Sequence, residues 1–283
     1  MAFHVYRTTR GVLVNQAGHH FLLTSMDWDD FVNRDGLFEF LQARVARMPR
    51  LTDTSIYATG DLLPPIGRQE VWAAGVTYFR SRTARMEEAS NSSGEQFYER
   101  VYEAERPELF FKSMPDRVVG PGGMVRIRRD SKWNVPEPEL TLMISTSGKI
   151  IGYTVGNDMS SRSIEGENPL YLPQAKMYDG SAALGPCLFV PDEPLSPATR
   201  ILLEIRREGG TAFSGNIHIK EMKRKPEELV DYLYRATTFP HGCYLMTGTG
   251  IVPPSNFTLM LGDEIRITIA PIGTLVNRVA LTE

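Results

Sequence analysis

The sequence contains little cysteine and no long apolar segment. Two cysteines among 283 residues, Cys187 and Cys243, are too few for a disulfide scaffold of this size. Because residues 1–10 also lack an apolar signal core, we expect a reducing, cytoplasmic location. No apolar run approaches the roughly 18 residues that cross a bilayer, so we expect no membrane partner.

Neither sign of charge dominates the sequence. The chain has 31 Lys and Arg residues against 34 Asp and Glu residues, a formal net charge of −3. Proteins that bind nucleic acid through bulk charge are basic, so this balance excludes that class of partner. Hydrophobic residues make up 42% of the chain, which is enough for a sizeable core.

The pattern of apolar and turn-forming residues along the sequence predicts two domains. Residues 1–65 are expected to form a small N-terminal α/β cap module, with short strands at 3–6 and 11–14 and a helix after Asp35. A turn-rich segment at 52–65 is interpreted as the linker. Covering a pocket against bulk water is one hypothesis for this module.

Residues 66–283 are expected to form the larger domain, in which strands outnumber helices. A late helix starts at Pro226, with two glutamates in its first turn and an apolar stripe beyond them. The sequence therefore predicts an α+β fold that is mainly β. The other expected helices lie at 80–89 and 95–105, and the expected strands lie at 71–76, 124–128, 140–145, 150–157, 201–206 and 264–269.

One expected hairpin has a register that can be tested against its own apolar pattern. A two-residue loop at Ser147-Gly148 would pair Thr146 with Lys149. The same register then pairs apolar residues on one face of the two strands, as a half-buried hairpin requires. These pairs are Leu140 with Val155, Leu142 with Tyr153 and Ile144 with Ile151.

The other face of this hairpin gathers carboxylates. The register sets Glu139 opposite Gly156 and Glu137 opposite Asp158. Three close carboxylates repel one another, so such a cluster binds a cation or holds protons. Ligation by oxygen alone suits Mg²⁺, Mn²⁺ or Ca²⁺ rather than zinc. The alternative is a set of solvated charges at a frayed hairpin end.

Several further motifs follow the carboxylates in order. They are the run from Gly152 to Arg162, Lys176-Met177-Tyr178-Asp179, Leu184-Gly185-Pro186, Thr247-Gly248-Thr249-Gly250, the run from Leu259 to Asp263, and the run from Ile272 to Asn277. Together with Glu137-x-Glu139, this series resembles the fumarylacetoacetate hydrolase superfamily from Val71 to the C-terminus. The resemblance implies a catalytic domain built as a mixed β-sandwich roll, beside a small N-terminal domain. It also implies Mg²⁺, or Mn²⁺ or Ca²⁺, on Glu137, Glu139 and Asp158, and a homodimer or higher homo-oligomer.

The sequence departs from the hydrolases of this superfamily at their catalytic dyad. Those enzymes carry a His and a Glu that activate water, whereas the aligned positions here are Ser81 and Ala84. A hydroxyl without an adjacent base activates water poorly, so hydrolysis of a carbon–carbon bond is not expected. The segments 80–88 and 98–112 resemble instead the branch that dehydrates 2-keto-3-deoxy pentonates, such as 2-keto-3-deoxy-D-arabinonate or its xylose-derived equivalent, to 2,5-dioxopentanoate and water.

The resemblance assigns roles to individual residues. A 2-oxo sugar acid would lose a proton from C3 to give an enolate, which a Lewis-acid cation stabilises, and would then lose its C4 hydroxyl. Lys176 is expected to stabilise the enolate or to act as the base, and Glu108 to shuttle the proton. An ordinary surface lysine and a helix-end charge are the alternative interpretations of these two residues.

Four further residues are expected to contact the substrate. Ser81 would bond to it or position a water, Arg80 and Arg82 would bind its oxygens, and Thr249 would hold its carboxylate. Two other cationic residues, Lys112 and Arg162, are interpreted as structural ion-pair partners.

Three other functions use the same residues. The first is hydrolysis of an acylpyruvate or decarboxylation of oxaloacetate on the same metal site. The second is a metal-dependent sugar-acid binding protein without turnover, and the third is a lyase that forms a Schiff base on Lys176.

Overall fold

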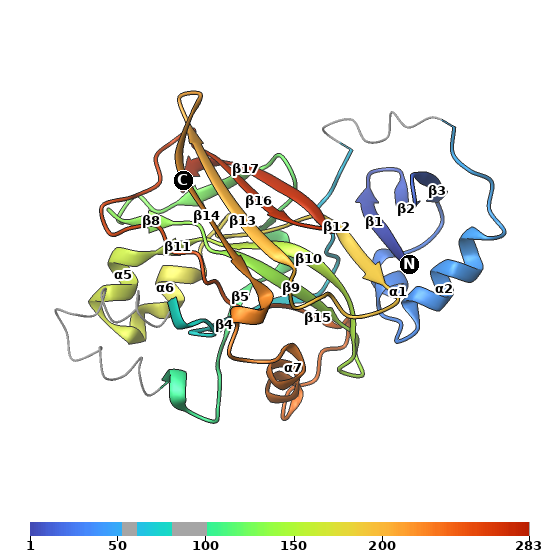
Figure 1. The fold of residues 1–283 in the computed structure, drawn as a ribbon, viewed down its shortest axis with the longest axis horizontal. Helices are drawn as coiled ribbons and strands as arrows, with labels where there is room; N and C mark the ends of the chain where they lie inside the picture. Colours follow the sequence, from blue (N-terminus) through green and yellow to red (C-terminus); the bar gives the residue numbers. More distant parts are fainter. Residues whose placement is uncertain (53–60, 81–100, 283) are drawn as a thin grey trace.

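A ten-stranded mixed sheet forms the centre of the protein (Figure 1). The computed structural model describes residues 1–52, 61–80 and 101–282 of the chain. Across the sheet the strands run β3 (His19–Leu23), β2 (Gly11–Gln16), β1 (Ala2–Thr8), β12 (Ala182–Pro191), β10 (Ile150–Asp158), β9 (Pro138–Ile144), β15 (Cys243–Met246), β4 (Glu70–Gly75) and β5 (Glu108–Ser113), and β6 (Val118–Val119) pairs with β12 off this path.

A second sheet of five strands covers one face of the first. Its order is β14 (Gly210–His218), β13 (Arg200–Arg207), β16 (Glu264–Ile269), β17 (Gly273–Leu281) and β7 (Met124–Ile127). Ile201, Leu203 and Ile205 alternate along β13 and share a hydrophobic core with Leu140 and Leu142 of β9. The predicted β-sandwich, mainly β with some helix, is therefore confirmed.

Helices and one short strand pair complete the fold. The helices are α1 (Trp28–Val32), α2 (Leu37–Val45), α5 (Arg162–Glu167), α6 (Leu172–Lys176) and α7 (Pro226–Tyr234), with 3₁₀ turns at Pro115–Arg117, Pro169–Tyr171 and Ile219–Glu221; β8 (Asn134–Val135) pairs with β11 (Ser160–Ser161). The late helix begins at Pro226 as predicted. The expected helices at 80–89 and 95–105 lie mostly outside the described residues. Among the described helices, none is long and apolar enough to cross a membrane.

The N-terminal elements share a second core with the rest of the chain. Phe31 of α1 and Leu41 of α2 belong to one apolar cluster with Met143, Leu188 and Tyr244 of the large sheet. Strand β1 also pairs with β12 in that sheet. In Figure 1 these elements lie at the opposite side of the molecule from α5 and α6. The division of the chain at residue 65 and the cap role stay predictions.

The register of the β9–β10 hairpin is confirmed where it concerns the acidic residues. Glu139 pairs with Gly156. Glu137 and Asp158 exchange two backbone hydrogen bonds, with N···O distances of 3.2 and 2.9 Å. The sequence pattern therefore predicted both pairings of the acidic residues correctly.

The predicted loop of this hairpin is wrong. The strands end at Ile144 and resume at Ile150, and these two residues pair. Ser145 and Lys149 are joined by a backbone hydrogen bond of 2.9 Å, which encloses three residues rather than two. Gly148 supplies the positive φ, +81°, that this longer turn needs. An irregularity just after Ile150 absorbs the extra residue, so the pairs farther along are not shifted.

Replacing Gly156 with Ala should destabilise the protein. A Cβ at this position would lie 2.2 Å from Thr141 Oγ1 and 3.2 Å from Met246 Cε, and both neighbours are buried. Such overpacking costs roughly 1–3 kcal/mol, which urea unfolding would measure. Gly210→Ala is the control, because its Cβ would find its nearest atom at 3.7 Å. Equal unfolding midpoints for the two variants would contradict this reading of the core.

Candidate metal centre

Three buried carboxylates meet where β9 and β10 run side by side. Glu137, Glu139 and Asp158 are all at most 4% exposed. Each offers one oxygen such that these three oxygens lie within 4.8 Å of one another. Glu137 and Asp158 come together through their paired backbones, and Gly156 leaves room opposite Glu139. The structure thus brings together the three residues that the sequence nominated as metal ligands, and they are not solvated charges.

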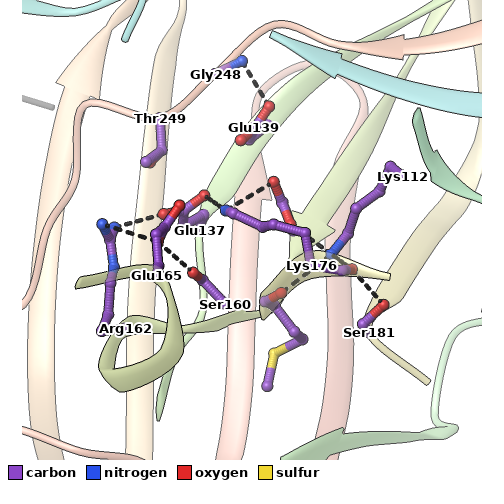
Figure 2. Close-up of polar contacts among 12 residues, drawn as sticks. Lys112, Glu137, Glu139, Ser160, Arg162, Glu165, Lys176, Ser181, Gly248 and Thr249 are labelled. Carbon is purple, nitrogen blue, oxygen red and sulfur yellow. Dashed lines mark hydrogen bonds and ion pairs between the residues drawn. The ribbon is translucent and has the colours of Figure 1, made fainter. Parts of the chain in front are cut away.

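Lys176 lies inside this cluster. It is the last residue of α6 and is fully buried. Its Nζ donates to Glu137 Oε2 at 2.5 Å and to Asp158 Oδ2 at 3.0 Å (Figure 2). The interpretation of Lys176 as an ordinary surface lysine is therefore wrong.

Lys112 and Arg162 form the ion pairs that the sequence analysis expected. Lys112 Nζ lies 2.6 Å from Asp158 Oδ1. The guanidinium of Arg162 forms an ion pair with Glu137 Oε1. Both cations are almost completely buried, so neither charge is solvated by bulk water. The acidic cluster is thus bounded by three cationic side chains, each from a different element.

Glu165 and Ser160 join this network and were missed by the sequence analysis. Glu165 Oε2 lies 3.6 Å from Arg162 Nη1 and accepts a 2.9 Å hydrogen bond from Ser160 Oγ. The signal available was the three-residue spacing of Arg162 and Glu165 at the start of a helix, directly after Asp158. That spacing is common on exposed helices, so it did not indicate burial.

The charges of this network do not cancel. The carboxylates are those of Glu137, Glu139, Asp158 and Glu165, and the cations are those of Lys112, Arg162 and Lys176. Among the residues that the structure describes, one formal negative charge is left over. An excess of buried negative charge is unfavourable, so the network favours a further cation or a proton.

Glu139 is the carboxylate on which the excess negative charge is least favourable. Burial raises the pKa of Glu139 well above its ordinary value, and the charges of Asp158 and Glu137 raise it further. The Gly248 amide opposes this shift through a 2.5 Å hydrogen bond to Glu139 Oε2. Carboxylate oxygens around surplus negative charge suit a hard divalent cation. The residues present therefore fit Mg²⁺.

The loop after β15 closes the site on the side of Glu139. Gly248 has a φ of +92°, and a Cβ there would lie 2.0 Å from Thr77 Oγ1, so only glycine fits. Thr77 in turn donates a 2.7 Å hydrogen bond to the Thr247 carbonyl. Thr249 is buried and directly follows Gly248, whose amide bonds to Glu139. The nominated substrate residue Thr249 thus lies at the site.

Glu108 lies on the same face of the large sheet as the cluster. It alternates along β5 with Phe110, which puts these two side chains on one face. The Phe110 ring centroid lies 5.8 Å from Lys176 Nζ. Gly75 makes room for Glu108, because a Cβ on Gly75 would lie 1.9 Å from Glu108 Oε2.

The remaining nominated residues are described only in part. Arg80 is exposed at the end of a described segment. Ser81 and Arg82 lie outside the described residues, as does Ala84.

The comparisons with known proteins agree with this geometry. The family model for the C-terminal domain of fumarylacetoacetate hydrolase matches residues 71–280. The chain belongs to this family. It is 49% identical over 216 residues to a probable 2-keto-3-deoxyxylonate dehydratase of Haloferax volcanii, an alignment covering 76% of this chain and 73% of the relative.

Two further relatives point the same way. A 2-dehydro-3-deoxy-D-arabinonate dehydratase of Saccharolobus solfataricus is 45% identical over 217 residues, covering 76% of this chain and 73% of that one. A solved structure of 2-keto-3-deoxy-D-arabinonate dehydratase, complexed with magnesium and 2,5-dioxopentanoate, superimposes with a TM-score of 0.84 at 35% identity over 100% of both chains. This member of the fumarylacetoacetate hydrolase family is thus similar to dehydratases along most of its length.

Glu139 should make the stability of the metal-free protein depend on pH. Because the pKa of Glu139 is raised in the folded state, the folded protein holds a proton that the unfolded chain releases above the ordinary value of 4.5. The free energy of unfolding therefore falls as the pH rises from 4.5 through the raised pKa. Glu139→Gln removes this loss, so the metal-free variant should melt roughly 3 °C or more above the metal-free parent at pH 8, and by much less at pH 4.

Thermal melts in EDTA at both pH values would check this expectation. Glu193→Gln, which replaces an exposed carboxylate, is the matched control and should leave both melting temperatures unchanged. A gain for Glu139→Gln that is equal at pH 4 and pH 8 would contradict the assignment of the imbalance to Glu139.

Proposed function

We propose that this protein is a divalent-metal-dependent hydro-lyase that converts a 2-keto-3-deoxy pentonate, the arabinonate or its xylose-derived equivalent, to 2,5-dioxopentanoate and water. The observation that carries the proposal is the buried cluster of Glu137, Glu139 and Asp158 with Lys176 bonded to two of its members. The identities of 49% and 45% to two dehydratases support it.

The three carboxylates would hold the metal ion. We propose Mg²⁺, with Mn²⁺ or Ca²⁺ as possible replacements, on Glu137, Glu139 and Asp158. When bound, the ion would supply Lewis-acid polarisation of the keto group of a 2-oxo acid. The surplus negative charge of the network and the single backbone donor on Glu139 among the described residues support this assignment.

Lys176 is proposed as the residue closest to the chemistry. Its ammonium is fixed by Glu137 and Asp158, so its positive charge lies within the cluster rather than in solvent. It can stabilise the negative charge that develops on the keto oxygen when C3 loses its proton. Preorganised charge of this kind is usually the largest contribution to catalysis.

The other roles are proposed from position. Glu108, on the same face of the sheet, would accept the C3 proton and pass it to the departing C4 hydroxyl. Thr249 would bind the substrate carboxylate beside the cluster, and Arg80 with Arg82 would bind substrate oxygens. Ser81 would bond to the substrate. Elimination of water from the substrate needs no nucleophilic water, so it is consistent with serine and alanine where the hydrolases have their dyad.

Assembly and location belong to the same proposal. We propose a homodimer or higher homo-oligomer in the cytoplasm, as the family resemblance and the two cysteines suggested. A reducing compartment is consistent with Cys187 and Cys243, which are free and buried.

Turnover with a defined substrate tests the function. Purified protein with Mg²⁺ and 2-keto-3-deoxy-D-arabinonate should form 2,5-dioxopentanoate, detected as an aldehyde and by mass spectrometry. EDTA should abolish the reaction and added Mg²⁺ should restore it. Glu139→Gln should lower kcat by at least about 10³, because it removes a carboxylate from the cluster. Glu193→Gln should retain full activity.

Other products would overturn this proposal. Pyruvate and a carboxylic acid from an acylpyruvate would indicate a hydrolase, and pyruvate with carbon dioxide from oxaloacetate would indicate a decarboxylase. Tight substrate binding without any product would indicate a binding protein.

A Lys176 variant separates charge stabilisation from covalent catalysis. Lys176→Met should lower kcat by roughly 10²–10⁴, since the variant lacks the ammonium that we propose stabilises the charge on the keto oxygen. Borohydride added to the parent enzyme with substrate should leave it unmodified by mass spectrometry. A borohydride-stable adduct on Lys176 would instead establish a Schiff-base lyase.

A further inference from the structure

Each carboxylate of the cluster has one oxygen held by a donor from outside the cluster. Asp158 Oδ1 is held by Lys112 Nζ at 2.6 Å. Glu137 Oε1 is held by the Arg162 guanidinium. Glu139 Oε2 accepts the hydrogen bond of the Gly248 amide at 2.5 Å (Figure 2). The three donors come from three different parts of the chain, so this common pattern does not arise from one local motif.

The second oxygens of two carboxylates face inward. Lys176 Nζ bonds to Glu137 Oε2 and Asp158 Oδ2, and to neither of the oxygens that Lys112 and Arg162 hold. Each of these carboxylates is therefore oriented, with an outer oxygen on a structural cation and an inner oxygen toward the centre of the cluster.

The outer cations are themselves fixed. Besides Asp158, Lys112 Nζ donates to the Met159 carbonyl at 3.0 Å and to the Lys176 carbonyl. With the 2.6 Å ion pair to Asp158 Oδ1, the ammonium therefore has three buried partners. Arg162 is similarly restrained between Glu137 and Glu165. Because both cations are buried and each has more than one partner, moving either of them away from its outer oxygen would disturb several interactions.

A carboxylate whose outer oxygen is paired with a fixed cation resists turning that oxygen toward a metal ion as well, so it would bind the ion through its inner oxygen, beside the Lys176 ammonium. Mg²⁺ accepts this readily, since it takes six ligands in a strict octahedron and completes it with water. Ca²⁺ takes six to eight oxygens and commonly uses both oxygens of a carboxylate. Holding the outer oxygens therefore penalises Ca²⁺ more than Mg²⁺.

We propose that Lys112 and Arg162 are positioning residues that set the metal selectivity of this site, by restricting Asp158 and Glu137 to one ligand oxygen each and so favouring Mg²⁺ over Ca²⁺. The inference rests on the proposed metal site, but it concerns which ion that site prefers rather than whether it turns over substrate.

The ratio of the Mg²⁺ and Ca²⁺ dissociation constants separates the effect of the number of ligand oxygens from the effect of charge. Removing either cation makes the cluster more negative, which strengthens binding of any divalent ion. Mg²⁺ and Ca²⁺ carry the same charge, so this change largely cancels in the ratio of their dissociation constants. The number of available ligand oxygens does not cancel, because only Ca²⁺ exploits the second one.

Titration calorimetry on EDTA-treated, full-length protein tests the proposal. Mg²⁺ and Ca²⁺ are each titrated into the parent and into Lys112→Met, which frees Asp158 Oδ1 at similar side-chain volume. The Ca²⁺-to-Mg²⁺ preference should rise by about tenfold or more in the variant. Ser181→Ala is the matched control: Ser181 Oγ donates to the Lys176 carbonyl at 2.8 Å, as Lys112 does, but leaves Asp158 untouched. Its ratio should equal that of the parent.

A second variant tests the proposal if Lys112→Met does not fold. Arg162→Met removes the guanidinium that pairs with Glu137 Oε1 and should shift the ratio in the same direction. An unchanged ratio in whichever variants fold, or an equal shift in Ser181→Ala, would overturn the selectivity role and leave the proposed function intact. Failure of the parent protein to bind either ion would overturn the metal site itself.

Discussion

The structure depends on the balance of buried charge around Glu137, Glu139 and Asp158. Carboxylates at most 4% exposed cannot be neutralised by water, and their mutual repulsion adds to the cost of burial. Lys112, Arg162 and Lys176 offset most of this cost, and each is delivered by a different element. Strand β5 supplies the first, the start of α5 the second and the end of α6 the third. The site can therefore form only after the sheet and both helices have packed.

The large sheet separates the apolar side chains of the cores from the buried charged side chains of the site. One face packs on the five-stranded sheet through alternating apolar residues such as Leu140 and Leu142. The opposite face carries Glu139, together with a second apolar core that includes Met143. Strand β9 is buried at every position. A strand buried on both faces holds its side chains rigidly, which suits a site whose carboxylates must each keep a fixed orientation.

Interactions between residues close in sequence could be predicted, whereas most interactions between distant segments could not. The pairing of Glu137 with Asp158 was predictable because it is local: one hairpin and its alternating apolar pattern determine it. The length of the hairpin turn was not predictable. A three-residue turn followed by a bulge gives the strands the same register as a two-residue turn with no bulge. Lys176 was nominated through family resemblance alone. Glu165 and Ser160 were missed, since nothing local separates a buried Arg–Glu pair from a solvated one. The pairing of β1 with β12 joins residues nearly 190 positions apart, beyond the range of any sequence periodicity.

The charge balance also bears on how an anionic substrate is received. In formal charge, four carboxylates and three cations leave the metal-free network with one negative charge. With Glu139 ionised this network repels a 2-oxo acid, and with Glu139 protonated, as its raised pKa favours, the network is neutral and does not attract one. The same residues with a divalent cation carry one positive charge, which a substrate carboxylate cancels. Lys176 is already bonded to two carboxylates, so it cannot replace that cation as the attraction for the substrate. A metal ion would thus contribute to binding as well as to catalysis, because the three described cations of the cluster already pair with its carboxylates.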